Sequence, residues 1–328
     1  KRMTLQWRLM VAYAHRHHAD HVLLMYLDQF QVALFTQKAP PCPVSGILFR
    51  PTLHYKTFDS IDKPIWKDWL WNWRKRITLQ LAFRNRRLHT VFSLDPYSLE
   101  SLRPFNHNVH VVHLPDPVEV SLVSPEEATA LRTANGVDST RNVLLLFGHL
   151  DIRKGLGPLA QALTQLPDTI LRQLSIWLVG TLESDQIPYA EAIESLTATR
   201  GLQVWRCHSF VSEPFAQVCF AAADGILALY QRHVGMSGIL VLAAAAGKPI
   251  LASDYGLLGE LVRRKQLGLA FDTTSPATIA EALTTFTKNP LLGNPEQMRN
   301  FASQNRTSEY ARVIFGSILV DRSLSVNP

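Results

Sequence analysis

The sequence is poor in cysteine and has no long apolar run. Its three cysteines (Cys42, Cys207 and Cys219) are too few and too scattered for a disulfide framework or a zinc site. The longest apolar run, residues 239–246, is far shorter than the roughly 18 residues that a membrane-spanning helix requires. These absences argue against a disulfide-stapled secreted domain and a membrane-spanning protein, and they favour a reducing, cytoplasmic setting.

The chain also lacks an initiating methionine and a signal-peptide pattern. We therefore expect its numbering to begin inside a longer gene product. What is present is 328 residues with 47% hydrophobic and 18% charged side chains, which is enough for two globular domains that each bury a core. The net charge of +6 predicts anionic partners, such as nucleotide phosphates or acidic lipids.

A proline-bounded stretch separates two halves of different texture. Pro115 and Pro117 stand on either side of Asp116, and a polar stretch follows up to residue 138, so this part of the chain is predicted to be a linker. We place the first domain at 1–117, the second at 118–305 and a C-terminal helix at 306–328. That helix is expected to pack back on the first domain.

Short, almost fully apolar runs alternate with helical patterns after the linker. The alternation predicts βαβ units in a doubly wound parallel sheet, and therefore an α/β fold. The predicted strands are 142–147, 174–179, 203–205, 225–230, 249–252 and 268–271, and the predicted helices are 155–166, 188–199, 213–223, 238–246, 257–265 and 276–287. The first half shows the pattern less regularly, with strands at 21–27, 46–49, 90–93 and 110–114.

Ligands of such sheets lie at the carboxyl ends of the strands, so the loops that follow the strands are the candidate sites. After the first strand of the second half come Gly148, His149, Arg153 and Lys154. This composition suits a diphosphate, because Arg offers a planar fork and Lys a point charge. A solvated loop whose charges only keep the protein soluble fits the same residues.

After the fourth strand, Gly235, Met236, Ser237 and Gly238 lead into an apolar helix. Ser237 is the expected N-cap, and the free N–H groups of a helix start bind anions. A helix that Ser237 caps, with nothing else bound, fits as well. Glu260 is predicted in the first turn of a later helix, where it would accept hydrogen bonds from sugar hydroxyls or merely complement the helix dipole.

Taken in order, these segments resemble the donor-binding domain of family-4 retaining glycosyltransferases. The resemblance covers about residues 142–272 and rests on spacing as well as on residue type. It is carried by Gly148, residues 153–155, residues 223–227, residues 243–253, residues 256–262 and Gly268.

The resemblance implies a GT-B fold, in which two Rossmann-like doubly wound domains face each other across a cleft. It also implies an enzyme with no bound metal and no cofactor, whose substrate is a nucleotide-diphosphate sugar. By similarity, Lys154 holds the diphosphate with help from Arg153 and from the backbone of residues 237–238. The base and ribose then lie near Phe210 and Val211.

The chain departs from the family pattern at three positions. His149 stands where the family usually has Arg, and Val234 and Leu242 stand where it usually has two glutamates in an E-x7-E arrangement. The chain resembles subgroups that have Ser-Gly before this helix and lack the glutamates. His54 follows a first-half strand at the place where the family often has a histidine near the donor sugar, so it is the candidate catalytic residue.

One predicted helix of the first half is both aromatic and basic. Such a helix fits peripheral contact with an anionic membrane at the inner face, as an enzyme with a lipid-linked acceptor would need. The alternative is an ordinary helix whose Trp face lies in the core. The face consists of Trp66, Trp69, Leu70, Trp73, Ile77 and Leu81, and the cations around it are Lys67, Arg74, Lys75, Arg76, Arg84, Arg86 and Arg87.

The predicted function is transfer of a hexose from a nucleotide-diphosphate sugar to a saccharide or lipid-linked acceptor with retention, as in bacterial polysaccharide biosynthesis. Two other interpretations stay open. Val234 and Leu242 fit a GT-B protein without catalysis that binds a sugar nucleotide or partners an active enzyme. Another GT-B enzyme, such as a sugar-nucleotide epimerase, fits the same pattern. Nucleic acid is not an expected partner, because the cations form no recognised motif.

Overall fold

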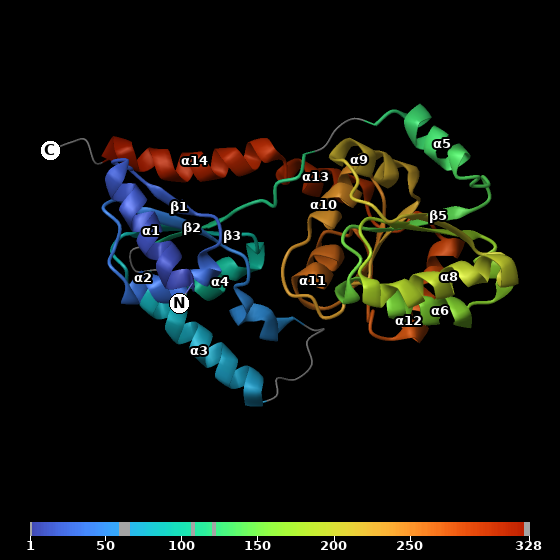
Figure 1. Cartoon of the computed structure of the whole chain (residues 1–328), viewed down its shortest axis with the longest axis horizontal. Coiled ribbons are helices and arrows are strands. Elements are labelled where there is room, and N and C mark those ends of the chain that lie inside the picture. The colour runs from blue at the N-terminus through green and yellow to red at the C-terminus, as the bar shows by residue number, and fades with distance from the viewer. Residues whose placement is uncertain (1, 59–65, 106–108, 120–122, 325–328) are drawn as a thin grey trace. The chain divides into compact units, whose positions relative to one another are not determined.

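The computed structural model describes residues 2–58, 66–105, 109–119 and 123–324. The chain divides into two compact units (Figure 1). The first unit comprises Lys1–Pro117, Val234–Met236 and Thr307–Pro328, and the second comprises Val118–His233 and Ser237–Arg306. Each is built on one parallel sheet, so the fold class is α/β. Within the described ranges, no helix has both the length and the apolar character to span a bilayer.

The sheet of the second unit has the strand order β10-β9-β8-β5-β6-β7. Chain order reverses between the neighbours β5 and β8, which makes this pair the topological switch point, where doubly wound sheets bind ligands. Leu145 of β5 pairs with Trp177 of β6 on one side and with Ile226 of β8 on the other. The strands are β5 (Asn142–Phe147), β6 (Leu174–Val179), β7 (Gln203–Cys207), β8 (Gly225–Ala228), β9 (Ile250–Ser253) and β10 (Gly268–Phe271).

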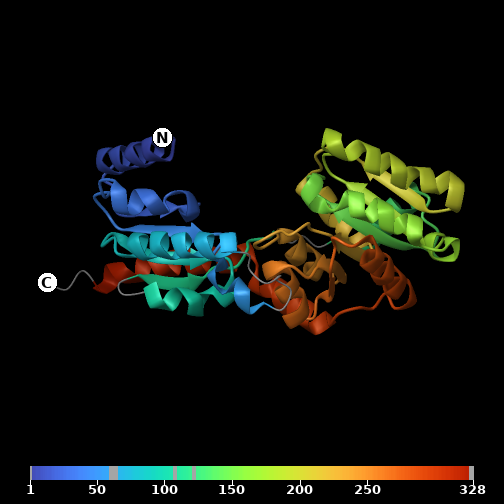
Figure 2. The same ribbon diagram turned by 90° about the horizontal axis from the view of Figure 1, so that it is seen from below.

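Helices cover both faces of this sheet, which is why its strands are continuously apolar. Leu144 and Leu146 of β5 face a core shared with α6, α8 and α12, and these three helices lie together in Figures 1 and 2. On the opposite face, Phe220 of α9 packs on Phe147 with 5.2 Å between ring centroids. The helices of this unit are α5 (Pro125–Ala134), α6 (Leu156–Gln165), α7 (Asp168–Leu171), α8 (Ile187–Arg200), α9 (Glu213–Ala222), α10 (Gly238–Ala245), α11 (Gly256–Arg264), α12 (Pro276–Lys288) and α13 (Pro295–Gln304).

The first unit has four parallel strands in chain order, β1-β2-β3-β4. Trp7 of α1 and Leu79 of α3 belong to the core on one face, and Ile314 of α14 packs with Ile47 and Phe92 on the other. The elements are α1 (Arg2–Arg16), β1 (Val22–Leu24), α2 (Gln31–Thr36), β2 (Val44–Leu48), α3 (Trp66–Phe83), β3 (Leu88–Ser93), α4 (Leu99–Leu102), β4 (His110–His113) and α14 (Thr307–Leu324).

The predicted linker is wrong in one part, because α5 lies within it. Ser124 and Glu127 form a capping box: Ser124 Oγ accepts from the Glu127 N–H at 3.2 Å, and Glu127 Oε2 accepts from the Ser124 N–H at 2.9 Å. This reciprocal pair satisfies two N–H groups at the helix start and fixes its first turn. Two strand predictions are clearly too long, since β8 ends at Ala228 rather than at residue 230, and β1 covers only Val22–Leu24 of the predicted 21–27.

The Trp face of α3 is only partly buried where the structure describes it, since Ile77 and Leu81 are half-buried. Trp73 is 52% exposed, whereas Leu79, Ala82 and Phe83 are buried. The buried residues follow i, i+3 and i+4 spacing, but on a different side of the helix from the one that the aromatic pattern predicts. The predicted face members Trp66, Trp69 and Leu70 have side chains that fall outside the described residues.

Candidate functional site

A short turn after β5 buries a lysine at the switch point of the second sheet. Asp151 caps this turn, η5 (Ile152–Lys154), by accepting from the Arg153 N–H at 2.9 Å. The Lys154 side chain is only 7% exposed, and its Nζ donates to Phe147 O and to Tyr230 Oη, both at 2.9 Å. A buried ammonium needs such acceptors, so Lys154 is held in one position at the carboxyl end of β5.

Two glycines allow close packing around Lys154 and its turn, because they have no Cβ. Gly148 has φ +106°, and a Cβ there would lie 3.3 Å from Lys154 Nζ. Gly155 has φ +74°, and a Cβ there would lie 2.3 Å from Leu229 O, closer than real Cβ atoms come to backbone. The turn can therefore pass this close to the end of β8 only with glycine at position 155.

Tyr230, which follows β8, connects this lysine to the start of α10. Its hydroxyl lies 2.8 Å from Ser237 Oγ, and both side chains are more than nine-tenths buried. Ser237 occupies the N-cap position of α10 but makes no side-chain cap hydrogen bond, so the predicted cap is wrong in its chemistry. The serine hydroxyl is turned to Tyr230 instead, and it leaves the N–H groups of the first turn to other acceptors.

Backbone hydrogen bonds fix the loops that carry these side chains. The Gln231 N–H donates to Arg153 O at 2.8 Å, which ties the β8 loop to η5. Gln231 Nε2 donates to Thr273 O and Thr273 Oγ1 donates to Tyr230 O, each at 2.9 Å, which ties in the loop after β10. Three strand ends therefore support one arrangement of Lys154, Tyr230 and Ser237.

His149 and Arg153, the other predicted cations, already have partners on the second unit. His149 Nδ1 lies 2.7 Å from Thr181 Oγ1, and its Nε2 lies 2.7 Å from Glu183 Oε1. Arg153 pairs with Asp151 at 2.7 Å. Partial burial acts to raise the pKa of the Asp151 carboxyl, but the hydrogen bonds from Arg153 outweigh it and leave that pKa below its usual value.

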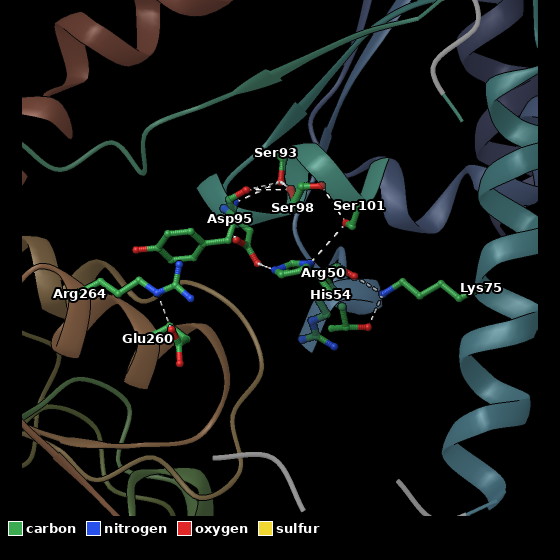
Figure 3. A network of polar contacts seen from close by, with 11 residues as sticks. Arg50, His54, Lys75, Ser93, Asp95, Ser98, Ser101, Glu260 and Arg264 are labelled. Carbon is green, nitrogen blue, oxygen red and sulfur yellow. Dashed lines mark hydrogen bonds and ion pairs between the residues drawn. The ribbon is translucent and has the colours of Figure 1, made fainter. Parts of the chain in front are cut away.

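Glu260 lies one residue further into its helix than the sequence predicts, beyond the first turn. Because α11 begins at Gly256, Glu260 is not in the first turn and does not complement the positive end of the dipole. Its buried carboxylate accepts from Arg263 Nη2 and from Arg264 Nε, both at 2.7 Å, and Figure 3 draws the second pair. Both arginines belong to its own helix.

The remaining predicted residues of the donor site differ in exposure. Phe210 follows β7 and is 88% exposed, while Val211 beside it is half-buried. Gly235 has φ +120°, a conformation that favours glycine. Met236 packs against the cluster of Ile47, Phe92, Leu94, Leu114 and Ile314 in the first unit.

In the first unit, His54 is held by a buried aspartate (Figure 3). Its Nε2 lies 3.0 Å from Asp95 Oδ2, and its Nδ1 lies 3.5 Å from Ser101 Oγ. Asp95 follows β3, is fully buried, and accepts from the Tyr97 N–H through Oδ1 at 2.9 Å. The imidazole therefore has a fixed orientation at the carboxyl end of this sheet.

A lysine of α3 supports the segment that carries His54. Lys75 Nζ donates to Arg50 O and to Thr52 Oγ1, the latter at 3.0 Å, at the beginning of η2 (Thr52–Thr57). Burial lowers the pKa of Lys75. Within the described parts of the chain, His, Cys, Asp and Glu side chains form no group of three or more suited to hold a metal ion.

Sequence reasoning missed the side chains that complete both arrangements. Tyr230 ends an apolar run, so the sequence pattern predicts a strand residue there and indicates no hydrogen bond for its hydroxyl. Gln231 and Thr273 carry no pattern of their own. Asp95 could have been noticed, because it follows the predicted strand 90–93 and stands before a proline, as helix-capping residues do.

The family profile of "Glycosyl transferases group 1" matches residues 127–311, more than half of the chain. The chain belongs to this family. The match covers nearly all of the second unit, including Lys154, Tyr230 and Ser237, and it ends inside α14.

A curated relative is the D-inositol 3-phosphate glycosyltransferase of a Nocardioides species. It is 26% identical over 216 residues, which are 62% of this chain and 44% of the relative. The chain therefore spans less than half the length of the curated relative that it matches.

Two solved structures are similar over nearly the whole chain. Anabaena HepE in complex with UDP has a TM-score of 0.65 at 19% identity, covering 98% of this chain and 82% of HepE. Sucrose-phosphate synthase from Thermosynechococcus elongatus also has a TM-score of 0.65, at 17% identity, covering 96% and 76% respectively. These likenesses show the GT-B fold, as the sequence predicted.

Proposed function

We propose that this protein transfers a hexose from a nucleotide-diphosphate sugar to a saccharide or lipid-linked acceptor, with retention of the anomeric configuration and without a bound metal. The observation that carries the proposal is the buried Lys154 at the switch point, next to the uncapped start of α10, in a chain of the glycosyl transferase group 1 family. HepE has been crystallised with UDP and with UDP-glucose, which supports a nucleotide-sugar donor for this chain.

Charge at the leaving group is the chemical problem that this site fits. When the glycosidic bond to the donor breaks, negative charge develops on the departing diphosphate. A fixed ammonium and the free N–H groups of a helix start stabilise that charge without reorganising during the reaction. Lys154 and the start of α10 supply these groups, and Arg153 adds a second cation.

We assign the other contacts by the same proposal. Phe210 and Val211 lie beside the base and ribose, and an exposed aromatic ring after β7 suits stacking on a base. His149 reaches the diphosphate from the β5 loop, and Glu260 lies on the sugar side. His54 contacts the transferred sugar, with the Asp95 carboxylate holding its ring.

A second candidate is a GT-B protein that binds a nucleotide sugar without turning it over. It is supported by the resemblance, which puts Val234 and Leu242 in the places of the two glutamates that the family usually carries, because neither side chain can accept a hydrogen bond from the donor. The two candidates agree on donor binding and differ only in nucleotide release.

The experiment that tests the proposal uses the full chain and a panel of UDP-, GDP-, ADP- and dTDP-hexoses. We expect one donor to raise the thermal midpoint and to release its nucleoside diphosphate slowly by hydrolysis. Lys154→Ala should abolish both effects, whereas Lys288→Ala, at the exposed end of α12, should change neither. Binding without release supports the second candidate. If no donor stabilises the folded wild type, both are refuted.

The proposal includes peripheral contact of α3 with an anionic membrane. Trp73, Arg74 and Arg76 are exposed side by side on this helix, and an aromatic ring flanked by cations suits the headgroup region of anionic lipids. Co-sedimentation with vesicles of phosphatidylglycerol and phosphatidylcholine at low salt checks it. The protein should pellet with them, and Trp73→Ala should pellet less. Absence of pelleting contradicts the contact.

A further inference from the structure

We propose that Tyr230 is the positioning residue of the donor site: its hydroxyl orients both the Lys154 ammonium and the Ser237 hydroxyl toward a bound diphosphate. The inference rests on the proposed function, because it specifies how that same site holds the diphosphate. Lys154 Nζ lies 2.9 Å from Tyr230 Oη, and Tyr230 Oη lies 2.8 Å from Ser237 Oγ. These contacts join the loop after β5 to the first residue before α10.

The hydrogen bond from Lys154 has a fixed direction, and the proposal assigns the direction of the next one. An ammonium has only donors, so Lys154 must donate to Tyr230 Oη. In the proposed arrangement the tyrosine hydroxyl donates its proton to Ser237 Oγ, which lies 2.8 Å away. The proton of Ser237 is then left for another acceptor, because the contact with Tyr230 is the one side-chain hydrogen bond that Ser237 makes among the described residues. The chain therefore ends in a donor at the uncapped start of α10.

The lysine has the same property. Of its three N–H groups, one donates to Phe147 O and one to Tyr230 Oη. Contacts between the described residues therefore use two of the three, and the third is available to a ligand. Without the tyrosine hydroxyl, the ammonium and the serine would each be able to turn to other partners.

Burial makes this orientation effective. Lys154 and Tyr230 are 7% exposed and Ser237 is 9% exposed, so solvent competes little for their hydrogen bonds. In such surroundings consecutive hydrogen bonds polarise one another, and an acceptor at the end of the chain is bound more strongly. An anion is the ligand that a row of donors ending at a helix start recognises, and a diphosphate is long enough to meet both Lys154 and Ser237.

The tyrosine ring alone would not have this effect. Lys154 Nζ also lies 4.5 Å from the centroid of the Tyr230 ring, a cation–π contact that phenylalanine would keep. Tyr230→Phe therefore removes the hydroxyl and retains the ring, its packing and the cation–π contact. A role limited to packing would leave ligand affinity unchanged in this variant.

The test is a double-mutant cycle on the full chain. Titration calorimetry measures the affinity of wild type, Tyr230→Phe, Ser237→Ala and the double variant for UDP, GDP, ADP and dTDP and for the four parent nucleosides. Tyr189→Phe is the matched control, since Tyr189 is a half-exposed tyrosine of α8 outside this chain of contacts. Urea unfolding of each variant reports whether it is folded.

For the nucleoside diphosphate that wild type binds, we expect Tyr230→Phe to weaken binding about tenfold, the effect of one hydrogen bond to a charged group. The affinity of Tyr230→Phe for the parent nucleoside should equal that of wild type. The control Tyr189→Phe should bind the diphosphate as tightly as wild type. Ser237→Ala should weaken diphosphate binding as well, and the double variant should be little weaker than Tyr230→Phe alone, because the serine depends on the tyrosine.

Three outcomes overturn the inference. Unchanged diphosphate affinity in Tyr230→Phe removes the role of the hydroxyl, and fully additive losses remove the link between Tyr230 and Ser237. If Tyr230→Phe does not fold, unchanged affinity of Ser237→Ala for the diphosphate still refutes the proposed chain of hydrogen bonds. A wild type that binds none of the four diphosphates refutes the proposed function itself, which separates that failure from a failure of Tyr230 alone.

Discussion

Replacing Gly155 with alanine tests whether the turn that positions Lys154 is held by close backbone packing. The alanine would have to adopt φ +74°, and its Cβ would lie 2.3 Å from Leu229 O. The positive φ costs about 1 kcal/mol for an alanine. Relief of the backbone overlap adds about 2 kcal/mol, as in overpacked cores. We therefore expect a loss of about 3 kcal/mol in the free energy of unfolding.

Gly247→Ala is the matched control, because Gly247 has φ +66° and a Cβ there would meet no atom within 4 Å. This variant should lose only the conformational term of about 1 kcal/mol. Urea unfolding of the two variants gives the difference, expected to be about 2 kcal/mol. Gly155→Ala should also weaken nucleoside diphosphate binding, and Gly247→Ala should not. Equal losses of stability in the two variants would refute the packing argument.

Two further predictions concern buried ionisable groups. Burial raises the pKa of Asp116 to about 6. Between about pH 4 and pH 6 the carboxyl therefore keeps its proton in the folded protein and loses it in the unfolded protein. The free energy of unfolding falls as the pH rises through this window. Because the side chain is partly exposed, the effect on stability is reduced, and we expect Asp116→Asn to raise the free energy of unfolding by about 1–2 kcal/mol at pH 8 and not at all at pH 4. Urea unfolding measures both values, and an equal increase at the two pH values would contradict this prediction. Burial also raises the pKa of the Cys219 thiol to about 12, so iodoacetamide at pH 8 should modify the half-buried Cys207 and spare Cys219, as mass spectrometry of the folded protein would show.

The strands of the second unit could be predicted almost to the residue, and the physical reason is their burial. A parallel strand covered on both faces is apolar at every position, so β5 and β6 stand out from the amphipathic helices around them. Glycines at the strand ends marked the loops. The positions of Gly148 and Lys154 at the end of a strand could therefore be predicted, whereas binding of a ligand by the β8 loop stays a prediction.

Contacts between those loops could not be predicted in the same way. Lys154 and Tyr230 are 76 residues apart, and they meet because β8 lies next to β5, which no local pattern states. The same holds for His54 and Asp95, which the pairing of β2 with β3 brings together. Pairing order is a property of the whole sheet.

The wrong predictions have local causes. The capping box of Ser124 and Glu127 is a readable helix signal, but the polar composition around it suggested a linker. Glu260 lies beyond the first turn because α11 begins at Gly256, one residue earlier than predicted. Of the two interpretations of the aromatic face of α3, packing in the core fails at Trp73, which faces solvent although bulky rings at helical spacing are typical of cores.

The measurement that tests the central claim most directly is the release of nucleoside diphosphate from nucleotide-hexose donors by the chain of 328 residues. The account predicts release from one donor by the wild type, none by Lys154→Ala, and unchanged release by Lys288→Ala. A wild type that is folded but neither binds nor cleaves any donor of the panel would contradict it, and so would a Lys154→Ala variant as active as the wild type.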